Sequence, residues 1–479
     1  ASTGIAATLI GGVTAHKRFG IPITKLDHDT VSMITNQSKE ADQLRDCDLI
    51  IWDEATASHR HALELVDRLL QDVMGNDLPF GGKTVVLGGD FRQCLPVVPR
   101  ASASAQIAAS IRMSPLWDHF NTFHLTHNHR SQQADFSEWL LTVGNGTSGI
   151  DTFLNPDKID IVHNPKTLIH NVFGHTINAE TLPHMRKHVI LSPTNKNTDA
   201  LNEAILQLME GANHCAESID QAIRDEESNM ILPEEFLHTL TPPGMPPHKL
   251  NLKVGGVYML LRNMDVEAGC CNGTRFFILD INRHYLHCEV IPNDPLPEGQ
   301  QAYQFYLPRV KLTPSASFPF TFTRKQYPIK PAFAMTINKS QGGTFDVVGL
   351  DLSSPVFSHG QLYVALSRVK NWQSIHIFMQ APPQARLADL PTTRNIVWAQ
   401  IFDHSVRNQQ IRQLTQRPPL PLCPGDDNEE VSTITHRSHQ HTDSPHLSNI
   451  QPQSEPTSIQ PQSFDDTYDI CTILDEDDD

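Results

Sequence analysis

The sequence lacks the features of a secreted or membrane protein. Its eight cysteines are scattered over 479 residues, and none forms a Cys-x-x-Cys pair. This spacing argues against a zinc site or a disulfide framework and favours a reducing compartment. No apolar run is long enough to cross a membrane, and no signal peptide is visible. We therefore expect no membrane partner.

An excess of positive charge is also missing, because the net charge is −17. Residues 419–479 hold 14 Asp and Glu residues against one Arg, which leaves a net charge of −4 for residues 1–418. A nearly neutral body suits a protein that grips one nucleic-acid strand in a local channel. The tail is rich in Pro, Gln, Ser and His and poor in large apolar residues. We expect it to be disordered, with an unknown protein as the partner of its acidic end.

What the sequence does contain is a pair of short apolar segments that end abruptly in polar residues. Leu49–Trp52 is followed by Asp53 and Glu54, and Val85–Leu87 by Gly88-Gly-Asp-Phe-Arg-Gln93. Buried parallel strands have this pattern, and their carboxyl ends form the ligand-binding edge of an α/β sheet. In nucleotide hydrolases the Asp helps to hold Mg²⁺ and the Glu activates water. The alternatives are core strands with polar ends and, for Asp53, a helix N-cap.

At that edge, Asp53 is the predicted Mg²⁺ ligand and Glu54 the predicted base. Asp90 and Gln93 are predicted to sense the γ-phosphate of ATP. One carboxylate suffices for Mg²⁺, which keeps several of its waters.

Apolar periodicity divides the rest of the chain. Residues 1–127 and the stretch from Ala332 to about Ala381 alternate strand and helix patterns, which indicates an α/β fold with parallel sheets. Residues 252–312 alternate like β-strands, with turns at Asn272-Gly273 and Asn293–Pro295, and predict a small barrel-like insertion. Residues 213–250 are expected to be rich in loops, and residues 382–418 helical and peripheral.

Several short segments follow one another along residues 1 to about 380: Ala1–Ala7, Thr14–His16, Trp52–Ala55, Gly88–Gln93, Asn128–Arg130, Leu261–Asn263, Asn272–Arg275, Ala332–Thr344 and His359–Val369. In this order they resemble the motifs of the Pif (petite integration frequency) DNA helicases. The resemblance is greatest to the versions that Helitron transposons carry.

The resemblance implies two RecA-like domains with an SH3-like insertion. Residues 1–127 would form the first domain, incomplete at its N-terminus. Residues 128–251 and 313–418 would form the second domain, with 252–312 as the insertion and 419–479 as the tail. It also implies ATP-driven 5′→3′ unwinding at single strands and single-strand/duplex junctions, in recombination, repair or telomere maintenance. The implied compartment is the nucleus, with the mitochondrion as the alternative, and the oligomeric state is unknown.

The motifs also imply roles at the junction of the two domains. Arg130 and Arg368 would act as arginine fingers, because a planar guanidinium pairs with phosphate oxygens. The alternative for Arg368 is a surface salt bridge on a helix over Gln361–Val369. The family usually has Met where His129 stands, which weakens the match at Arg130. Gln341 and Gly343 would relay the nucleotide state, although the family commonly has Gln-Gly-Gln-Thr there.

DNA contacts are implied at two further places. Thr3, Thr14, His16 and Lys17 match one DNA-binding motif. Its counterpart late in the chain comprises four residues: Thr336, Asn338, Lys339 and Ser340. Hydroxyls, amides and lysines bind phosphates without discriminating between bases.

The family's phosphate-binding loop, Gly-x-x-x-x-Gly-Lys-Thr, is missing from this sequence, and its expected place is just upstream of Ala1. Gly81-Gly-Lys-Thr84 imitates it, but Asp77 replaces the first Gly and a strand follows where a helix is required. Lys83 is therefore predicted to be a turn residue, and the chain to be an inactive fragment of an ATP-dependent helicase. The alternative is a helicase-derived remnant that binds single-stranded DNA.

Overall fold

The computed structural model describes residues 1–402 except 23–25, 99, 224–232, 266–267, 293–298, 315–320 and 381–390. The predicted turn at Asn293–Pro295 and the predicted disordered tail lie outside these residues. Within them, no helix is both long and apolar enough to span a bilayer.

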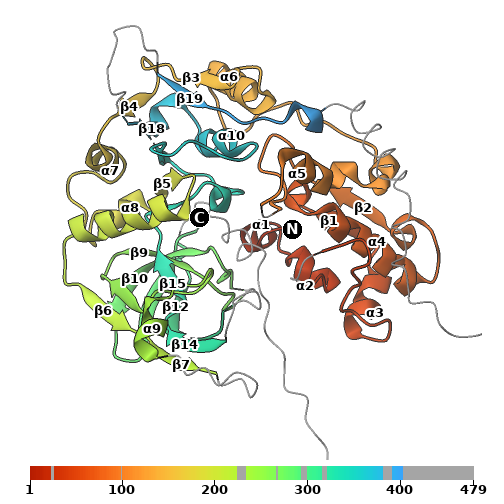
Figure 1. Ribbon diagram of the computed structural model, residues 1–479, viewed down its shortest axis with the longest axis horizontal. Coiled ribbons are helices and arrows are strands. Elements are labelled where there is room, and N and C mark those ends of the chain that lie inside the picture. Colours follow the sequence, from red (N-terminus) through yellow and green to blue (C-terminus); the bar gives the residue numbers. More distant parts are fainter. Residues whose placement is uncertain are drawn as a thin grey trace, which may run out of the picture. The chain divides into compact units, whose positions relative to one another are not determined.

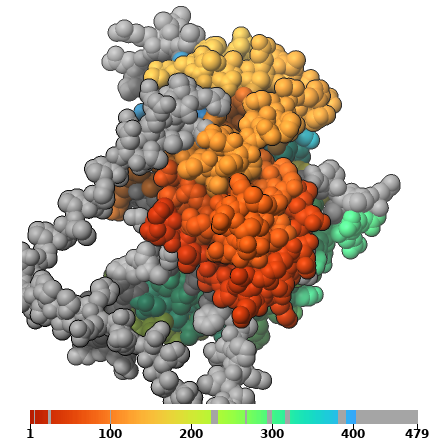
Figure 2. Space-filling model, turned by 90° about the vertical axis from the view of Figure 1, so that its right-hand side faces the viewer, coloured from red at the N-terminus to blue at the C-terminus, as the bar shows by residue number. Residues whose placement is uncertain are grey.

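The first region, residues 1–127, is built on two parallel strands, β1 (Leu49–Trp52) and β2 (Thr84–Leu87). Its longest helix, α4 (Arg60–Met74), repeats apolar residues every three or four positions and buries that face in the core. Shorter helices complete the region: α1 (Gly4–Leu9), α2 (Ala15–Phe19), α3 (Lys39–Asp46) and α5 (Ala103–Ala109). In Figure 2 these residues form the red and orange surface.

The second region contains a five-stranded sheet that is parallel throughout, in the order β16-β5-β17-β18-β4. Its strands are β4 (Asp160–Val162), β5 (His188–Ser192), β16 (Ala334–Thr336), β17 (Val347–Asp351) and β18 (Ile375–Phe378). The helices of this region are α6 (Ala134–Asn145), α7 (Pro165–Phe173), α8 (Asn195–Leu208) and α10 (Gln361–Leu366). The predicted α/β class with parallel sheets is confirmed (Figure 1).

Between β5 and β16 the chain forms a β-rich region that is larger than the predicted insertion. An antiparallel five-stranded sheet has the order β12-β11-β10-β9-β15. Its strands are β9 (Val257–Leu260), β10 (Arg275–Ile281), β11 (Tyr285–Val290), β12 (Gln304–Pro308) and β15 (Ile329–Pro331). The predicted turn at Asn272-Gly273 is confirmed, because Gly273 has φ +89° and the Thr274 N–H bonds to the Cys271 carbonyl.

Two further small sheets enlarge this region, so the predicted bounds of 252–312 are too narrow. They pair β6 with β8 and place β14 between β13 and β7. Their elements, with the short helix between β7 and β8, are β6 (His214–Glu217), β7 (Ile219–Ala222), α9 (Glu234–Thr239), β8 (Lys249–Leu252), β13 (Val310–Leu312) and β14 (Phe322–Gln326). Residues 213–250 were expected to be rich in loops. The strands β6 and β7 were not foreseen there, because each is short and polar and pairs with a strand that comes later in the chain.

Arg275 fastens the five-stranded antiparallel sheet to the parallel one. Its guanidinium is buried and donates to the carbonyl oxygens of Ala332 at 3.2 Å and His188 at 2.9 Å. It also lies over the ring of Phe345. Burial lowers the pKa of Arg275 to about 10, and the side chain remains charged at neutral pH.

The expectation that residues 382–418 are helical and peripheral is wrong where they are described. Residues 392–394 form β19, which pairs antiparallel with β3 (Asp151–Phe153). Only one short 3₁₀ turn follows, at Ala399–Ile401. Ile401 is fully buried against Leu95, Ile107 and Met113 of the first region.

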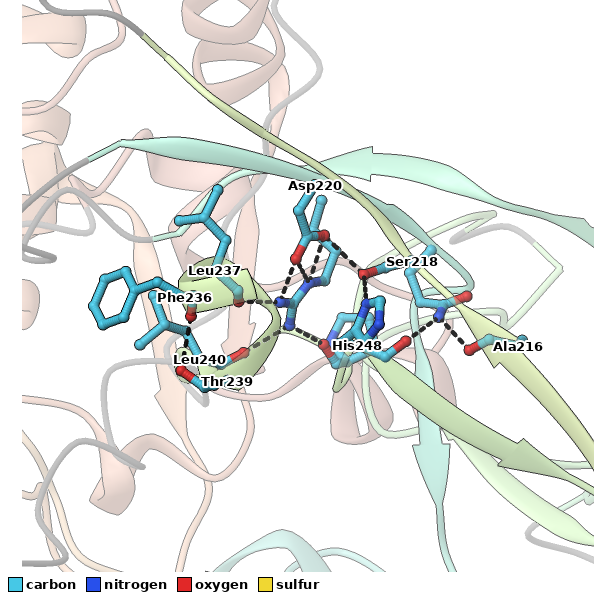
Figure 3. A network of polar contacts seen from close by, with 11 residues as sticks. Ala216, Ser218, Asp220, Phe236, Leu237, Thr239, Leu240 and His248 are labelled. Atoms are coloured by element: carbon cyan, nitrogen blue, oxygen red, sulfur yellow. Dashed lines mark hydrogen bonds and ion pairs between the residues drawn. The ribbon is translucent and has the colours of Figure 1, made fainter. Parts of the chain in front are cut away.

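Arg324 and Asp220 form a buried ion pair inside the β-rich region (Figure 3). The guanidinium donates to both carboxylate oxygens at 2.6–3.2 Å. It also donates to three carbonyl oxygens, those of Leu237, Leu240 and Pro246. Burial alone would raise the pKa of Asp220, but the Arg324 and Ser218 hydrogen bonds lower it. The pair thus holds β14, β7 and the chain around α9 together.

Replacing Arg324 with leucine should therefore lower the free energy of unfolding by about 3–5 kcal/mol, because Asp220 would be left as an uncompensated buried charge. Urea unfolding followed by circular dichroism measures the change. Lys158→Met is the matched control, since Lys158 pairs with Asp135 at the surface and such pairs contribute at most about 1 kcal/mol. Equal effects of the two substitutions would contradict this assignment.

Candidate active site

Asp53 and Glu54 follow β1 at the carboxyl edge of the first parallel pair, as predicted. The Ala55 N–H donates to the Gly88 carbonyl and the Gly88 N–H to the Trp52 carbonyl, so the ends of β1 and β2 are joined here. Glu54 has φ +51°, a left-handed conformation that is uncommon for a residue with a side chain. It precedes a 3₁₀ turn without capping it. Asp53 does not hold the N-cap position, so the N-cap alternative for Asp53 is wrong.

The two glycines of the second strand end leave room for these groups. A Cβ at Gly88 would stand 2.9 Å from the Asp53 carboxylate, and one at Gly89 would stand 2.8 Å from the Thr56 hydroxyl oxygen. Both distances are below 3.0 Å, so a side chain at either position would displace the Asp53 carboxylate or the Thr56 side chain. The Gly-Gly of this motif therefore leaves the Asp53 carboxylate in its place.

Two acceptor oxygens at this edge are buried without a hydrogen-bond partner in the part of the chain described. They are Oε2 of Glu54 and Oε1 of Gln93. Buried polar atoms are nearly always paired, and an exception calls for a ligand, a water or an ion. Burial raises the pKa of Glu54, followed by the charges of Asp53 and Asp90, whereas Arg368 and Arg130 act in the opposite direction. Both predicted arginines thus lie close enough to act on Glu54.

Arg368 is only 2% exposed, and the surface-salt-bridge alternative is wrong. Helix α10 ends at Leu366 rather than Val369, so Arg368 turns inward past its end. Its guanidinium donates to the Val364 carbonyl at 2.9 Å and to the Gly343 carbonyl at 3.2 Å. Burial lowers the pKa of Arg368 to about 10, and the neighbouring Arg130 adds to this effect.

Arg130 is exposed and approaches Arg368 from a different part of the chain. Its Nη1 donates to the Ser367 carbonyl at 3.0 Å, next to Arg368 in the chain. The structure therefore brings together Glu54 and both predicted arginine fingers, although they come from three distant parts of the sequence. It also places the Gly343 carbonyl on Arg368, which gives the predicted relay segment a direct contact with one finger. Gln341 of that segment is half-buried.

The carboxylate of Asp90 is already in use, so the prediction that it senses the γ-phosphate is not supported by its contacts. Oδ1 accepts from the backbone N–H of Arg92 at 3.0 Å and from its guanidinium at 3.3 Å. Oδ2 accepts from the Tyr363 hydroxyl at 3.0 Å. Asp90 instead joins β2's end to helix α10 of the second region.

Sequence reasoning gave no role to Tyr363, His359 or Gly360, which form this junction. His359 donates from Nε2 to the Phe91 carbonyl at 2.8 Å, while its Nδ1 accepts the Trp398 N–H at 2.9 Å. Gly360 has φ +75°, and a Cβ there would stand 2.4 Å from the Arg92 carbonyl oxygen. The sequence offered one clue, because His359 and Gly360 begin the segment His359–Val369 that resembles a helicase motif.

The first group of predicted DNA contacts lies around α1 and α2. Thr3 and Thr14 are the N-caps of these helices, and their hydroxyl oxygens accept backbone N–H groups at 3.2 and 3.4 Å. Lys17 is exposed. His16 is half-buried, and burial lowers its pKa to about 4, so it is neutral near pH 7. Of the four, Lys17 is the one that can bring positive charge to a phosphate.

The second group of predicted DNA contacts lies at and beside a tight 3₁₀ turn, Asn338–Ser340. Thr336 and Ser340 are buried, and the Ser340 hydroxyl donates to the Ile337 carbonyl. The Asn338 side-chain oxygen accepts from Cys94 and Gln361. Thr336 and Ser340 are thus buried and Asn338 is half-buried, and contact of the three with DNA stays a prediction. Lys339 lines a cavity of about 180 Å³ together with Arg186 and Lys187.

Lys83 is a turn residue, as predicted. Its ammonium donates to the Arg45 carbonyl at 2.5 Å, and Thr84 begins β2 directly after it. Phe19 belongs to the core, where its ring lies 5.8 Å from that of Trp52.

Comparison with known proteins agrees with this geometry. The family model for PIF1-like helicases matches residues 1–152, and the model for the 2B domain of DNA helicase Pif1 matches residues 235–281. The ATP-dependent DNA helicase Pif1 of Bdellovibrio bacteriovorus is 29% identical over 382 residues, 79% of this chain and 76% of the relative. The human counterpart is 27% identical over 401 residues, 81% of this chain but only 54% of the relative.

Solved structures show the same fold. Bacteroides Pif1 bound to single-stranded DNA superposes with a TM-score of 0.57 at 22% identity, over 78% of this chain and 80% of that one. The complex of Bacteroides Pif1 with ADP-AlF₃ and single-stranded DNA gives a TM-score of 0.58 at 20% identity, over 86% of each chain. The predicted RecA-like architecture is confirmed by these matches. The chain is thus similar to the Pif1-like DNA helicases along about four fifths of its length.

Proposed function

We propose that this chain forms the motor of an ATP-dependent helicase that moves 5′→3′ along single-stranded DNA and opens duplexes at junctions. The observation that carries the proposal is the buried Oε2 of Glu54, which has no partner among the described residues and lies in the field of Arg130 and Arg368. Oε1 of Gln93, beyond the end of β2, is a second such oxygen. The Glu54 and Gln93 oxygens can accept hydrogen bonds from a water molecule, and the guanidinium groups of the two arginines can donate to the oxygens of a phosphoryl group. The chain spans little more than half of the human relative, so the activity of the whole protein is part of the proposal.

Each residue has a defined task in this mechanism. Asp53 would hold Mg²⁺, for which an oxygen ligand at a sheet edge fits, and the ion would neutralise charge on the phosphates. Glu54 orients and deprotonates the attacking water, with Gln93 as its second acceptor. Arg368 and Arg130 stabilise the charge that develops on the γ-phosphoryl oxygens. The hydrogen bond between Tyr363 and Asp90 transmits the change from bound ATP to bound ADP to helix α10.

The DNA partner and the biological setting are proposals of the same kind. Related helicases have been solved with single-stranded and forked DNA. Lys17 and Lys339 supply sequence-independent phosphate contacts here. A nuclear role in recombination, repair or telomere maintenance, and an origin in a Helitron transposon, are supported by the motif resemblance alone.

Residues 1–479 alone should hydrolyse ATP no faster than background. The sequence has no Gly-x-x-x-x-Gly-Lys-Thr segment, and Lys83 of the similar segment is bonded to a carbonyl oxygen. Backbone N–H groups and a lysine that bind the β- and γ-phosphates are therefore missing. Phosphate release with and without single-stranded DNA measures this.

The matched comparison is an extended chain, in which a strand and the phosphate-binding loop of a relative precede Ala1. It should hydrolyse ATP in a DNA-stimulated manner and unwind a forked duplex. If the extended chain binds DNA but hydrolyses no ATP, the proposed function fails and the chain is a DNA-binding remnant. Robust hydrolysis by residues 1–479 alone would instead assign a phosphate-binding role to Lys83.

Lys339→Ala should weaken the binding of single-stranded DNA and reduce the salt dependence of log K by about one unit, because one phosphate contact is lost. Fluorescence anisotropy at a series of salt concentrations measures both quantities. Lys158→Ala is the control, since that ammonium is bonded to Asp135. An unchanged salt slope for Lys339→Ala would remove Lys339 from the DNA path.

A further inference from the structure

Three segments of the β-rich region bring two imidazoles and a carboxylate together beside the buried ion pair. Figure 3 labels two of these residues, Asp220 and His248. Asp220 belongs to β7, His238 to α9, and His248 directly precedes β8. One potential ligand atom of each lies within 4.8 Å of the others. The two histidine rings are stacked, with 3.7 Å between their centroids and 10° between their planes.

The hydrogen bonds around Asp220 determine which nitrogen of His248 carries the proton. The Ser218 hydroxyl donates to the ionised Asp220 carboxylate at 2.7 Å. Its oxygen must then accept from His248 Nδ1, which lies 2.9 Å away. The proton of the neutral ring is therefore on Nδ1, and Nε2 keeps its lone pair. Metal-binding histidines are commonly oriented in this way, through a hydrogen bond from the nitrogen that does not bind the metal.

The surroundings favour a cation. A cavity of about 490 Å³ opens onto both histidines and Asp220, and three more carboxylates line it: Glu217, Glu234 and Glu235. The lining thus contains four carboxylates and one ammonium, that of Lys249. Asp220 already accepts from Arg324 and Ser218, so a bound cation would have to share this carboxylate with Arg324.

We propose that His238, His248 and Asp220 bind one divalent transition-metal ion of the zinc type. Zn²⁺ accepts imidazole nitrogen and carboxylate oxygen, and three protein ligands leave a fourth position, here open to the cavity. The ion would connect β7, α9 and the start of β8. The scattered cysteines do not exclude this site, because its ligands are His and Asp residues from distant positions in the sequence.

Zinc binding to the full chain tests the proposal. Equilibrium dialysis with metal analysis should show that the double variant His238→Gln/His248→Gln binds one Zn²⁺ fewer per chain than the unmodified protein. Co²⁺ should give tetrahedral absorption that the double variant lacks. The control is His170→Gln/His175→Gln, whose rings lie 4.6 Å apart but belong to no metal-type cluster among the described residues, and it should retain both signals. Zinc bound elsewhere is common to all three proteins and cancels in the comparison.

A second variant keeps every ligand in place. Ser218→Ala removes the acceptor that orients His248 and should weaken zinc affinity by about 10–100-fold, as the loss of such partners does elsewhere. If the double variant does not fold, the zinc affinity of Ser218→Ala is the test of the proposal. Unchanged stoichiometry in the folded double variant, or unchanged affinity in Ser218→Ala, would overturn the proposal.

Discussion

Arg368→Ala in the extended chain should lower DNA-stimulated ATP hydrolysis by about 10³–10⁵-fold, the contribution of an arginine finger to phosphoryl transfer. DNA affinity should change by no more than a few-fold, because the guanidinium lies beside Glu54 and not in the DNA path. ATPase rates at saturating DNA and anisotropy titrations measure the two effects. Unwinding of a forked duplex should be lost together with hydrolysis.

Arg368 also has a structural role, which the controls must separate from its chemical one. Its guanidinium bonds to the carbonyl oxygens of Val364 and Gly343, so alanine leaves these groups unpaired. Arg368→Lys keeps the charge but loses the planar fork, and should restore folding far better than hydrolysis. If Arg368→Ala hydrolyses ATP normally but no longer binds DNA, the two sites have been assigned to the wrong residues.

The part of the site that could be predicted from sequence is local. Asp53, Glu54 and Gln93 directly follow strands, and the carboxyl ends of neighbouring parallel strands always meet at one edge. The alternation of strand and helix patterns after Ala332 likewise indicated part of the second parallel sheet. Nothing in these predictions required knowledge of which distant residues touch.

What the sequence did not show depends mainly on distant contacts and, at Ser340, on a tight local turn. The Tyr363 hydroxyl meets Asp90 across 273 positions, so no local pattern shows that the carboxylate is occupied. The hydroxyl of Ser340 suits a phosphate by type, but a 3₁₀ turn directs it to the Ile337 carbonyl. Likewise, β7 is too short and polar to be predicted as a strand until β14, about a hundred residues later, pairs with it.

Glu54→Gln in the extended chain should reduce hydrolysis by about 10²–10⁴-fold, the usual contribution of a general base, while ATP binding stays nearly intact. The amide has almost the shape of the carboxylate but cannot accept the proton of water. ATP affinity from a fluorescent analogue and the single-turnover rate separate binding from chemistry. Glu40→Gln, at an exposed position of α3, is the control for the loss of one carboxylate in the first region.

The acid limb of the pH profile gives an independent check on Glu54. Burial, with Asp53 and Asp90, raises the pKa of this carboxyl above its ordinary value of 4.5. The base must be ionised to act, so the single-turnover rate should fall as the pH drops through this raised pKa and recover above it. The residual rate of Glu54→Gln should lack that limb, since the amide does not titrate. If Glu54→Gln hydrolyses ATP at the unmodified rate, or keeps the same acid limb, another group activates the water.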